Sequence, residues 1–248
     1  MGIRVERLRR DYGEVIAVDD LSFHVSPGEI VGLLGPNGAG KTTTLRTLAG
    51  ILEPTSGRVA IAGHDIGSNP IDAKRQLAFM PDEPHLFEYL TVVEHLRLIA
   101  RLYGVQDFDR RARELLDELE MAGKERLLPG ELSRGMRQKV VIACGLVRDA
   151  PVLLFDEPLT GLDPIGIRRM RRTIAARAEQ GAAILVSSHL LHLVQEVCTR
   201  VIIMDRGRKI ADGTVAELAA RVDIEGAGST LEQIFIHVTG RGAPGGPA

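Results

Sequence analysis

Apolar and polar positions alternate with a period of two in the first part of the chain. Residues Ile3 to Leu8 and Leu21 to Val25 show this alternation, which predicts half-buried strands. Gly57 to Ile61 also predicts a strand, and it ends in a turn at Ala62-Gly63. The chain therefore begins with strands and turns, and these would form a small β subdomain.

Short, almost wholly apolar runs predict a second kind of strand, one buried on both faces. They are Ile30–Leu34, Val152–Phe155, Ala183–Ser187 and Val201–Met204. Helical spacing follows the first two of them, from Lys41 to about Ile51 and from Ile167 to Glu179. Buried strands alternating with helices predict an α/β fold with a parallel sheet covered on both faces.

The middle of the chain has helical spacing instead. Thr91 to Tyr103 and Asp109 to Met121 carry apolar residues on one face and charged residues on the other. Thr91 is a plausible N-cap, and Glu94 would complete a capping box. We therefore expect a small helical lobe at roughly Pro84 to Ala150.

Composition excludes several classes of protein. The 248 residues are 44% hydrophobic and 26% charged with a net charge of -2, which is typical of a globular protein without a basic nucleic-acid surface. Aromatic residues make up only 4%, and Trp is absent, which argues against a base-stacking surface. The sequence shows no signal-peptide core at its start and no apolar stretch of about 20 residues. Cys144 and Cys198 form no metal or redox motif and are expected to be buried, reduced thiols.

A glycine-rich loop lies between a predicted strand and a predicted helix. It consists of Gly35, Pro36, Asn37, Gly38, Ala39, Gly40, Lys41, Thr42 and Thr43. Glycines let backbone N–H groups close around phosphate oxygens, and the helix N-terminus adds a positive dipole end. Lys41 would reach the β and γ phosphates, and the Thr42 hydroxyl would bind Mg²⁺. The alternative is a glycine-rich turn that only begins a helix.

Two carboxylates follow the buried strand Val152 to Phe155, at the end where α/β sheets bind their ligands. Asp156 suits an outer-shell hold on Mg²⁺, and Glu157 suits a base that polarises the attacking water. Acids at a strand end are common, so the interpretation depends on the phosphate loop nearby. A third segment, Leu132 to Gln138, opens a helix with Ser133 and Gly135. These residues either cap that helix or face a γ-phosphate.

These segments, in this order, resemble the ATP-binding cassette (ABC) family. Leu132 to Met136 stands where that family has its LSGGQ signature loop, and Gly161-Leu162-Asp163 resembles its D-loop. Ser188-His189 after an apolar strand resembles the switch histidine. Tyr12 stands where the family places an aromatic residue that stacks on adenine. The resemblance covers nearly the whole chain, to about Gly240.

The resemblance implies an α/β P-loop NTPase fold: a RecA-like core with a parallel sheet, an N-terminal antiparallel β subdomain and an inserted α-helical subdomain. It implies one nucleotide-binding domain over residues 1–239, with the core at 1–83 and 151–239 and the helical subdomain at 84–150. Residues 240–248 are rich in Gly and Pro, and we expect a disordered tail there.

The resemblance also implies two subunits packed head to tail around two ATP molecules with Mg²⁺, the second subunit being another copy or a homologous ATPase chain. Ser133 and Gly135 would contact the γ-phosphate held by the partner, His189 the phosphate held by its own subunit, and Asp163 would link the two sites. The two subunits would close when ATP binds and open after hydrolysis, and this cycle would move a partner protein.

Two departures from the family pattern concern the site. The signature loop has Arg134 and Met136 where LSGGQ has Gly and Gln, although Ser133 and Gly135 are kept. Asp82 stands where Gln usually contacts Mg²⁺ and the attacking water. Asp can bind metal and accept a hydrogen bond from water, so Asp82 remains a catalytic and metal-binding candidate. It is otherwise a turn residue after Pro81.

The stretches Leu86 to Leu96 and Leu231 to Gly240 resemble ATPase subunits of bacterial efflux-type exporters. The expected partner is a separate membrane-spanning permease chain, which would place this protein at the cytoplasmic face of the cell membrane. An importer stays possible. The alternatives are a soluble ABC ATPase acting on nucleic acid or ribosomes, which the charge balance and the single cassette disfavour, and a catalytically silent scaffold. The last is disfavoured because Lys41, Asp156, Glu157 and His189 are all present.

Overall fold

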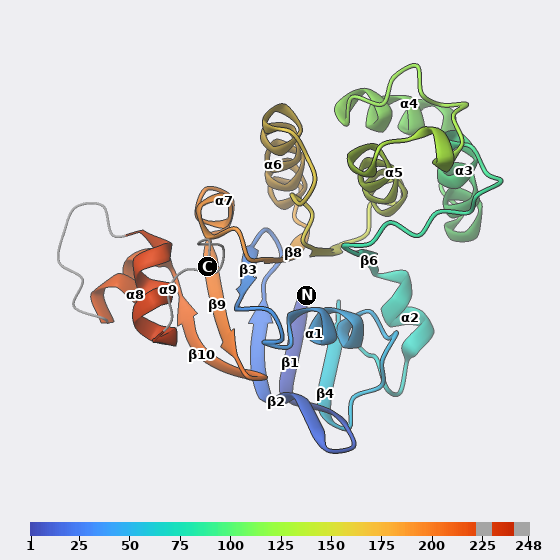
Figure 1. Ribbon diagram of the computed structural model, residues 1–248. Helices are drawn as coiled ribbons and strands as arrows, with labels where there is room; N and C mark the ends of the chain where they lie inside the picture. The colour runs from blue at the N-terminus through green and yellow to red at the C-terminus, as the bar shows by residue number, and fades with distance from the viewer. Residues whose placement is uncertain (222–229, 241–248) are drawn as a thin grey trace.

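The computed structural model describes residues 1–221 and 230–240, and its strands form two sheets (Figure 1). The N-terminal sheet is antiparallel and has the order β2-β1-β4-β5. Its strands are β1 (Ile3–Tyr12), β2 (Val15–Val25), β4 (Ser56–Ile61) and β5 (His64–Asp65). Val5, Leu21 and Val59 are among its buried residues, as the alternating pattern predicts.

The second sheet has six strands in the order β10-β9-β3-β8-β7-β6. They are β3 (Ile30–Leu34), β6 (Leu77–Met80), β7 (Val152–Asp156), β8 (Ala183–Ser188), β9 (Arg200–Asp205) and β10 (Arg208–Gly213). Neighbouring strands are parallel except β9 and β10, which form an antiparallel hairpin. Every residue of β3, β7 and β8 is buried, so the apolar runs were correctly interpreted.

Helices follow most of the strands, and several of them pack on the second sheet (Figure 1). They are α1 (Lys41–Leu48), α2 (Pro70–Arg75), α3 (Val92–Tyr103), α4 (Phe108–Glu118), α5 (Arg134–Leu146), α6 (Pro164–Glu179), α7 (Leu191–Gln195), α8 (Val215–Arg221) and α9 (Leu231–Thr239), with a 3-10 turn η1 at Pro129–Glu131. Helices α3, α4 and α5 gather on one side of the molecule, between β6 and β7 in the chain. This arrangement confirms the predicted fold class with its helical insertion.

The predicted boundaries needed small corrections. The first helix ends at Leu48 rather than near Ile51, because Gly50 turns into the left-handed region at φ 65°. The helix expected to reach Met121 ends at Glu118. The capping box is confirmed: the Thr91 hydroxyl accepts from the Glu94 N–H at 3.4 Å, and the Glu94 carboxylate accepts from the Thr91 N–H at 2.8 Å.

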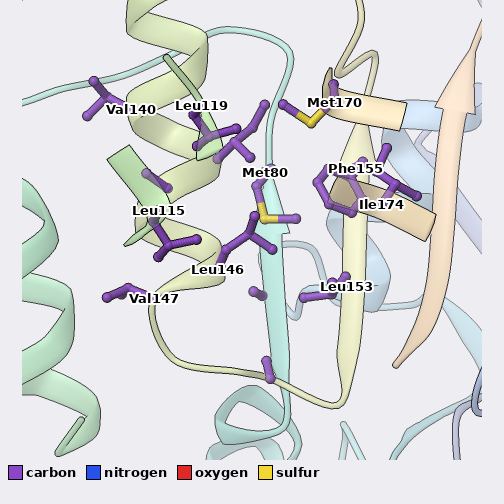
Figure 2. Packing of buried hydrophobic residues seen from close by; sticks show 14 of the residues in the cluster. Met80, Leu115, Leu119, Val140, Leu146, Val147, Leu153, Phe155, Met170 and Ile174 are labelled. Carbon is purple, nitrogen blue, oxygen red and sulfur yellow. The ribbon is translucent and has the colours of Figure 1, made fainter. Parts of the chain in front are cut away.

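The helical lobe packs on the sheet through an apolar cluster (Figure 2). Met80 of β6 lies between Leu146 of α5 and Phe155 of β7, and all three are buried. Gly145 lies so close to Met80 that a Cβ at this position would overlap the Met80 Sδ. The absence of a side chain at Gly145 therefore permits the close approach of α5 to the edge of the sheet.

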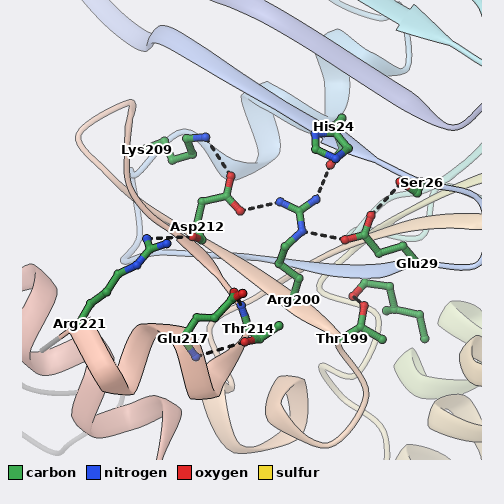
Figure 3. A network of polar contacts seen from close by, with 11 residues as sticks. His24, Ser26, Glu29, Thr199, Arg200, Lys209, Asp212, Thr214, Glu217 and Arg221 are labelled. Atoms are coloured by element: carbon green, nitrogen blue, oxygen red, sulfur yellow. Dashed lines mark hydrogen bonds and ion pairs between the residues drawn. The ribbon is translucent and has the colours of Figure 1, made fainter. Parts of the chain in front are cut away.

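Arg200 joins the two sheets at the opposite edge (Figure 3). Its guanidinium donates to Glu29 at 2.7 Å, to Asp212 of β10 at 2.5 Å and to the backbone carbonyl of His24 in β2. One side chain thus holds the ends of strands from both sheets. The predicted tail, residues 240–248, lies outside the described residues apart from Gly240. Within the described ranges, no helix is both long and apolar enough to cross a membrane.

Candidate active site

The glycine-rich loop connects the end of β3 to the start of α1, as the sequence predicts. Gly38 and Gly40 have φ angles of 81° and 100°, a region that side-chain-bearing residues avoid. A Cβ on Gly40 would overlap the carbonyl oxygen of Ala17 in β2. The first turn of α1 contains no acidic residue, so its free N–H groups and dipole remain available for an anion.

Lys41 is the buried cation of this loop, with 7% of its surface exposed. Its Nζ donates to the carbonyl oxygens of Gly35 at 2.8 Å and Pro36 at 3.3 Å. Burial lowers the pKa of Lys41, and the nearby charges of Glu157 and Asp156 oppose this shift. The ammonium group is therefore held at the mouth of the loop, facing the acidic strand end.

Asp156 receives hydrogen bonds from two hydroxyl groups on other elements. The Oγ1 of Thr42 donates to its Oδ1 at 3.3 Å, and the Oγ of Ser187 donates to the same oxygen at 2.5 Å. Asp156 itself is only 2% exposed. The structure thus brings together the phosphate loop and the acidic strand end, which are separated by more than a hundred residues in the sequence.

Glu157 leaves the strand with a left-handed backbone at φ 49°, which is unusual for a residue with a long side chain. Its N–H donates to the carbonyl of Ser187 at 3.2 Å and to the Ser187 Oγ at 3.1 Å, and these bonds hold the turn. His189 lies beside it, with Nδ1 2.9 Å from the Glu157 Oε2. The Glu157 side chain is 13% exposed, so a water molecule could reach it from one side.

Asp82 lies in the turn after β6, close enough to the acidic strand end to interact with it. Burial raises the pKa of Asp82, and the charges of Asp156 and Glu157 add to the rise. Arg134, the first residue of α5, opposes the rise from 3.9 Å away. The buried amide of Gln138 on the same helix donates to the carbonyl of Pro81 at 3.1 Å.

The segment with Ser133 and Gly135 begins α5. The Ser133 hydroxyl accepts from the Met136 N–H at 3.2 Å and so caps the helix. A Cβ on Gly135 would lie 2.8 Å from the Gly161 carbonyl oxygen, so this loop contacts the Gly161–Asp163 segment of the same subunit. Asp163 caps α6 by accepting from Gly166 N–H at 2.8 Å. Both segments therefore have a capping role, which does not exclude a phosphate contact.

Tyr12 is the last residue of β1, and 48% of it is exposed. The guanidinium of Arg10 lies 4.6 Å from the centre of its ring. A cation on one face leaves the other face of the ring open for stacking.

Sequence reasoning missed two residues that build the site. Ser187 binds both Asp156 and the backbone of Glu157, and its only signal is a hydroxyl at the end of an apolar strand. Gln138 contacts the Asp82 turn from within α5, and nothing in the pattern predicts that contact.

The donors at this site fit Mg²⁺. The Thr42 hydroxyl and the Asp156 and Asp82 carboxylates are the hard oxygen ligands that this ion prefers. Where the structure describes the chain, no three His, Cys, Asp or Glu side chains form a metal cluster of their own. A magnesium ion at this site would therefore need phosphate oxygens and water as further ligands, as is usual when it binds with a nucleotide.

The fold and the site define a P-loop nucleotide hydrolase with a helical insertion. Residues 18–160 match the family model described as "ABC transporter". The chain is 33% identical over 239 residues to the ABC-type transporter ATP-binding protein EcsA of Bacillus subtilis (strain 168), covering 96% of both chains. It is 39% identical over 212 residues to the SkfA peptide export ATP-binding protein SkfE of the same organism, covering 85% of this chain and 88% of the relative.

A solved structure described as the ATP binding subunit of an ABC transporter superposes with a TM-score of 0.91 at 34% identity, covering 96% of this chain and 100% of the other. The chain belongs to the ABC transporter family, in which it is an ATP-binding subunit that hydrolyses ATP for transport.

Proposed function

We propose that residues 1–239 form one nucleotide-binding domain whose P-loop, Gly35 to Thr43, encloses the triphosphate of ATP. Backbone N–H groups at the start of α1 and the Lys41 ammonium group would donate to the β and γ phosphates. Tyr12 would stack on adenine with the ring face that Arg10 leaves open. The observation that carries the proposal is the contact of Thr42 with Asp156, because it places the loop beside the acidic strand end.

Thr42 and Asp156 would hold Mg²⁺, the first directly and the second from the outer shell, with Asp82 as a further ligand. When bound, the ion supplies positive charge against the β and γ phosphate oxygens. Ser187 and Thr42 fix the Asp156 carboxylate in place.

Glu157 would polarise the attacking water, and the geometry favours this role. The His189 Nδ1–H and the His189 backbone N–H both point to one carboxylate oxygen, Oε2, at 2.9 and 3.3 Å. Among the described residues no donor to the other oxygen, Oε1, is found, so Oε1 could accept from water. His189 would also contact the γ-phosphate once the nucleotide is bound.

Two subunits would close head to tail around two ATP molecules. In Figure 1 helix α5 lies in the helical lobe, whereas α1 lies apart from it and contacts β7 and β2, one strand of each sheet. Ser133 and Gly135 would therefore meet the γ-phosphate of a partner subunit, another copy or a homologous chain. Asp163, beside the Gly135–Gly161 contact, would link the two sites.

The membrane-spanning permease would dock in the groove between the helical lobe and the sheet. A cavity of about 430 Å³ lies there, lined by residues that include Phe79, Leu86, Ile99, Tyr103 and Arg148. It contains no residue of the P-loop, so it suits a partner rather than the nucleotide. Phe87 and Tyr89, at the rim, are 63% and 89% exposed. Such exposed aromatic side chains are typical of interaction surfaces.

His95 holds the rim of this groove. Its Nε2 accepts from the Phe87 N–H at 2.9 Å, while its Nδ1 lies 2.8 Å from the Thr91 carbonyl oxygen. These hydrogen bonds hold the backbone of the rim in one conformation, a few residues after Asp82. The rim would therefore transmit movement between the ATP site and the permease. Charge reversal at Glu83 and Glu88 should weaken coupling to the permease, and unaltered coupling would contradict this docking site.

Substrate choice would lie in the permease. An export role is supported by the similarity to a relative named for peptide export. The protein would act at the cytoplasmic face of the membrane, held there by the permease.

The deciding experiment is a mild-detergent pull-down of the tagged protein from its own cells, followed by mass spectrometry. Recovery of a polytopic membrane chain in matching amount would support the proposal. Recovery of ribosomes or soluble chains alone would contradict it.

A further inference from the structure

Arg134 and Asp82 face each other within one subunit. The Arg134 Nη2 lies 3.9 Å from the Asp82 Oδ1, although the two residues belong to different loops of the site. Arg134 begins α5 directly after Ser133, and Asp82 follows β6. Both are also positions at which the resemblance described above implies another residue, Gly at 134 and Gln at 82.

Asp82 adds a negative charge to a site that already contains the carboxylates of Asp156 and Glu157. Its carboxylate interacts with both Asp156 and Glu157, and a nucleotide bound beside them would bring further negative charge. Among the residues that the structure describes, Arg134 forms an ion pair with Asp82 and opposes the rise in its pKa. A glutamine in place of Asp82 would need no such partner.

The Arg134 side chain is directed by its surroundings. Its Cδ and Nε lie 3.8 and 3.9 Å from the position that a Cβ on Gly161 would occupy, so its stem runs alongside this glycine. Gln138, four residues later and on the same face of α5, donates to the Pro81 carbonyl oxygen at 3.1 Å. Helix α5 therefore contacts the Pro81–Asp82 turn at two points, one buried and one partly exposed.

We propose that Arg134 is a positioning residue that holds the Asp82 carboxylate and offsets its charge beside Asp156 and Glu157. Arg134 thereby compensates in this chain for the negative charge that Asp82 adds to the site. The inference rests on the proposed function, because Asp82 matters only if the adjacent site binds Mg²⁺ and ATP.

The pair also connects two different ATP molecules. Asp82 would face the nucleotide of its own subunit, whereas Ser133, next to Arg134, would face the nucleotide of the partner. If the Ser133 loop moves when the two subunits close, the Arg134–Asp82 ion pair in the same subunit would change with it.

A double-mutant cycle tests the proposal. The full-length variants Arg134→Gln, Asp82→Asn and the double variant are assayed for ATP hydrolysis, and kcat and KM for Mg-ATP are measured separately. We expect Arg134→Gln to raise KM about threefold to fivefold, the upper end for an exposed ion pair, with a smaller change in kcat. In the Asp82→Asn background the same substitution should change KM by less than about twofold.

Two further variants make the test specific. Arg134→Lys keeps the positive charge, so its KM should be close to the wild-type value. Arg137→Gln removes an exposed arginine from the same helix and should leave KM unchanged. Higher salt should shrink the effect of Arg134→Gln, because it screens exposed charges. Arg134→Gln and Arg137→Gln should have the same unfolding midpoint temperature. Equal midpoints would exclude loss of folding as the cause of the higher KM in Arg134→Gln.

An equal rise in KM in both backgrounds would overturn the proposal, as would a wild-type KM in Arg134→Gln. This failure is distinct from failure of the proposed function. Turnover retained in Glu157→Gln would contradict the proposed site, whereas an additive cycle would contradict only the pairing.

Discussion

The Nδ1 of His189 lies 2.9 Å from the Oε2 of Glu157, and the backbone N–H of His189 reaches the same oxygen at 3.3 Å. The two residues follow adjacent parallel strands, β8 and β7, and meet at the carboxyl edge of the sheet. His189, which follows the neighbouring strand, therefore holds the Oε2 oxygen of the carboxylate. Neither of these two contacts involves the Oε1 oxygen. This arrangement suits a group that must orient a water molecule repeatedly.

Replacing Glu157 by Gln should abolish turnover while leaving ATP binding intact. The amide keeps the shape of the side chain but cannot accept a proton, and loss of a general base typically costs a factor of about 10² to 10⁴ in rate. Unhydrolysed ATP should then favour a dimer, which size-exclusion chromatography with and without Mg-ATP would detect. Wild-type turnover in this variant would remove Glu157 as the base.

Replacing Lys41 by Ala should weaken ATP binding. The ammonium group donates charge-assisted hydrogen bonds, each contributing about 1.5–3 kcal/mol, so affinity should fall by roughly tenfold to a hundredfold. Titration calorimetry measures this change, with Lys124→Ala, an exposed lysine of the helical lobe, as the matched control. Equal affinity in the Lys41 variant and the control would contradict the phosphate role.

Cys144 and Cys198 should resist thiol reagents in the folded protein. Both are free and half-buried rather than fully buried as the sequence predicts, and Cys144 lines the cavity beside Phe79. Burial still raises the pKa of each thiol to about 12. Because the thiolate is the reactive form, modification at pH 8 should be slower than for an exposed cysteine. A colorimetric thiol assay should count no reactive group in buffer and two in denaturant. Rapid reaction of either thiol in buffer would show that it is accessible.

Replacing Gly145 by Ala should destabilise the fold despite the better helix propensity of Ala. The added Cβ would overlap Met80 in the buried cluster of Figure 2, and overpacking costs about 1–3 kcal/mol, whereas the propensity gain is about 1 kcal/mol. Denaturant unfolding should therefore give a lower free energy for Gly145→Ala than for Gly130→Ala, where a Cβ meets nothing within 4 Å. Equal stability would mean that Met80 can rearrange freely.

The sequence predicted the fold class, the buried strands and the P-loop, because each depends on local patterns. Strands β3 and β7 begin where the apolar runs begin, and Thr91 caps its helix as predicted. Short elements such as α2 and α7 escaped prediction, since a few residues do not display a helical period.

The contacts between distant segments could not be predicted from patterns. Ser187 and Asp156 meet because β8 and β7 are neighbours, and the chain order does not specify that pairing. Likewise, Asp82 and Arg134 are far apart in the sequence, and only the fold brings their side chains within 3.9 Å of each other.

Lys41 already has hydrogen-bond partners within its own loop, the carbonyl oxygens of Gly35 and Pro36. The ammonium group thus stabilises the conformation of the loop. The conformational entropy of the loop is therefore lost when the chain folds rather than when a ligand binds. In the proposed binding mode, Lys41 would exchange these carbonyl oxygens for phosphate oxygens. The contribution of Lys41 to nucleotide affinity would then be the difference in free energy between the two kinds of acceptor.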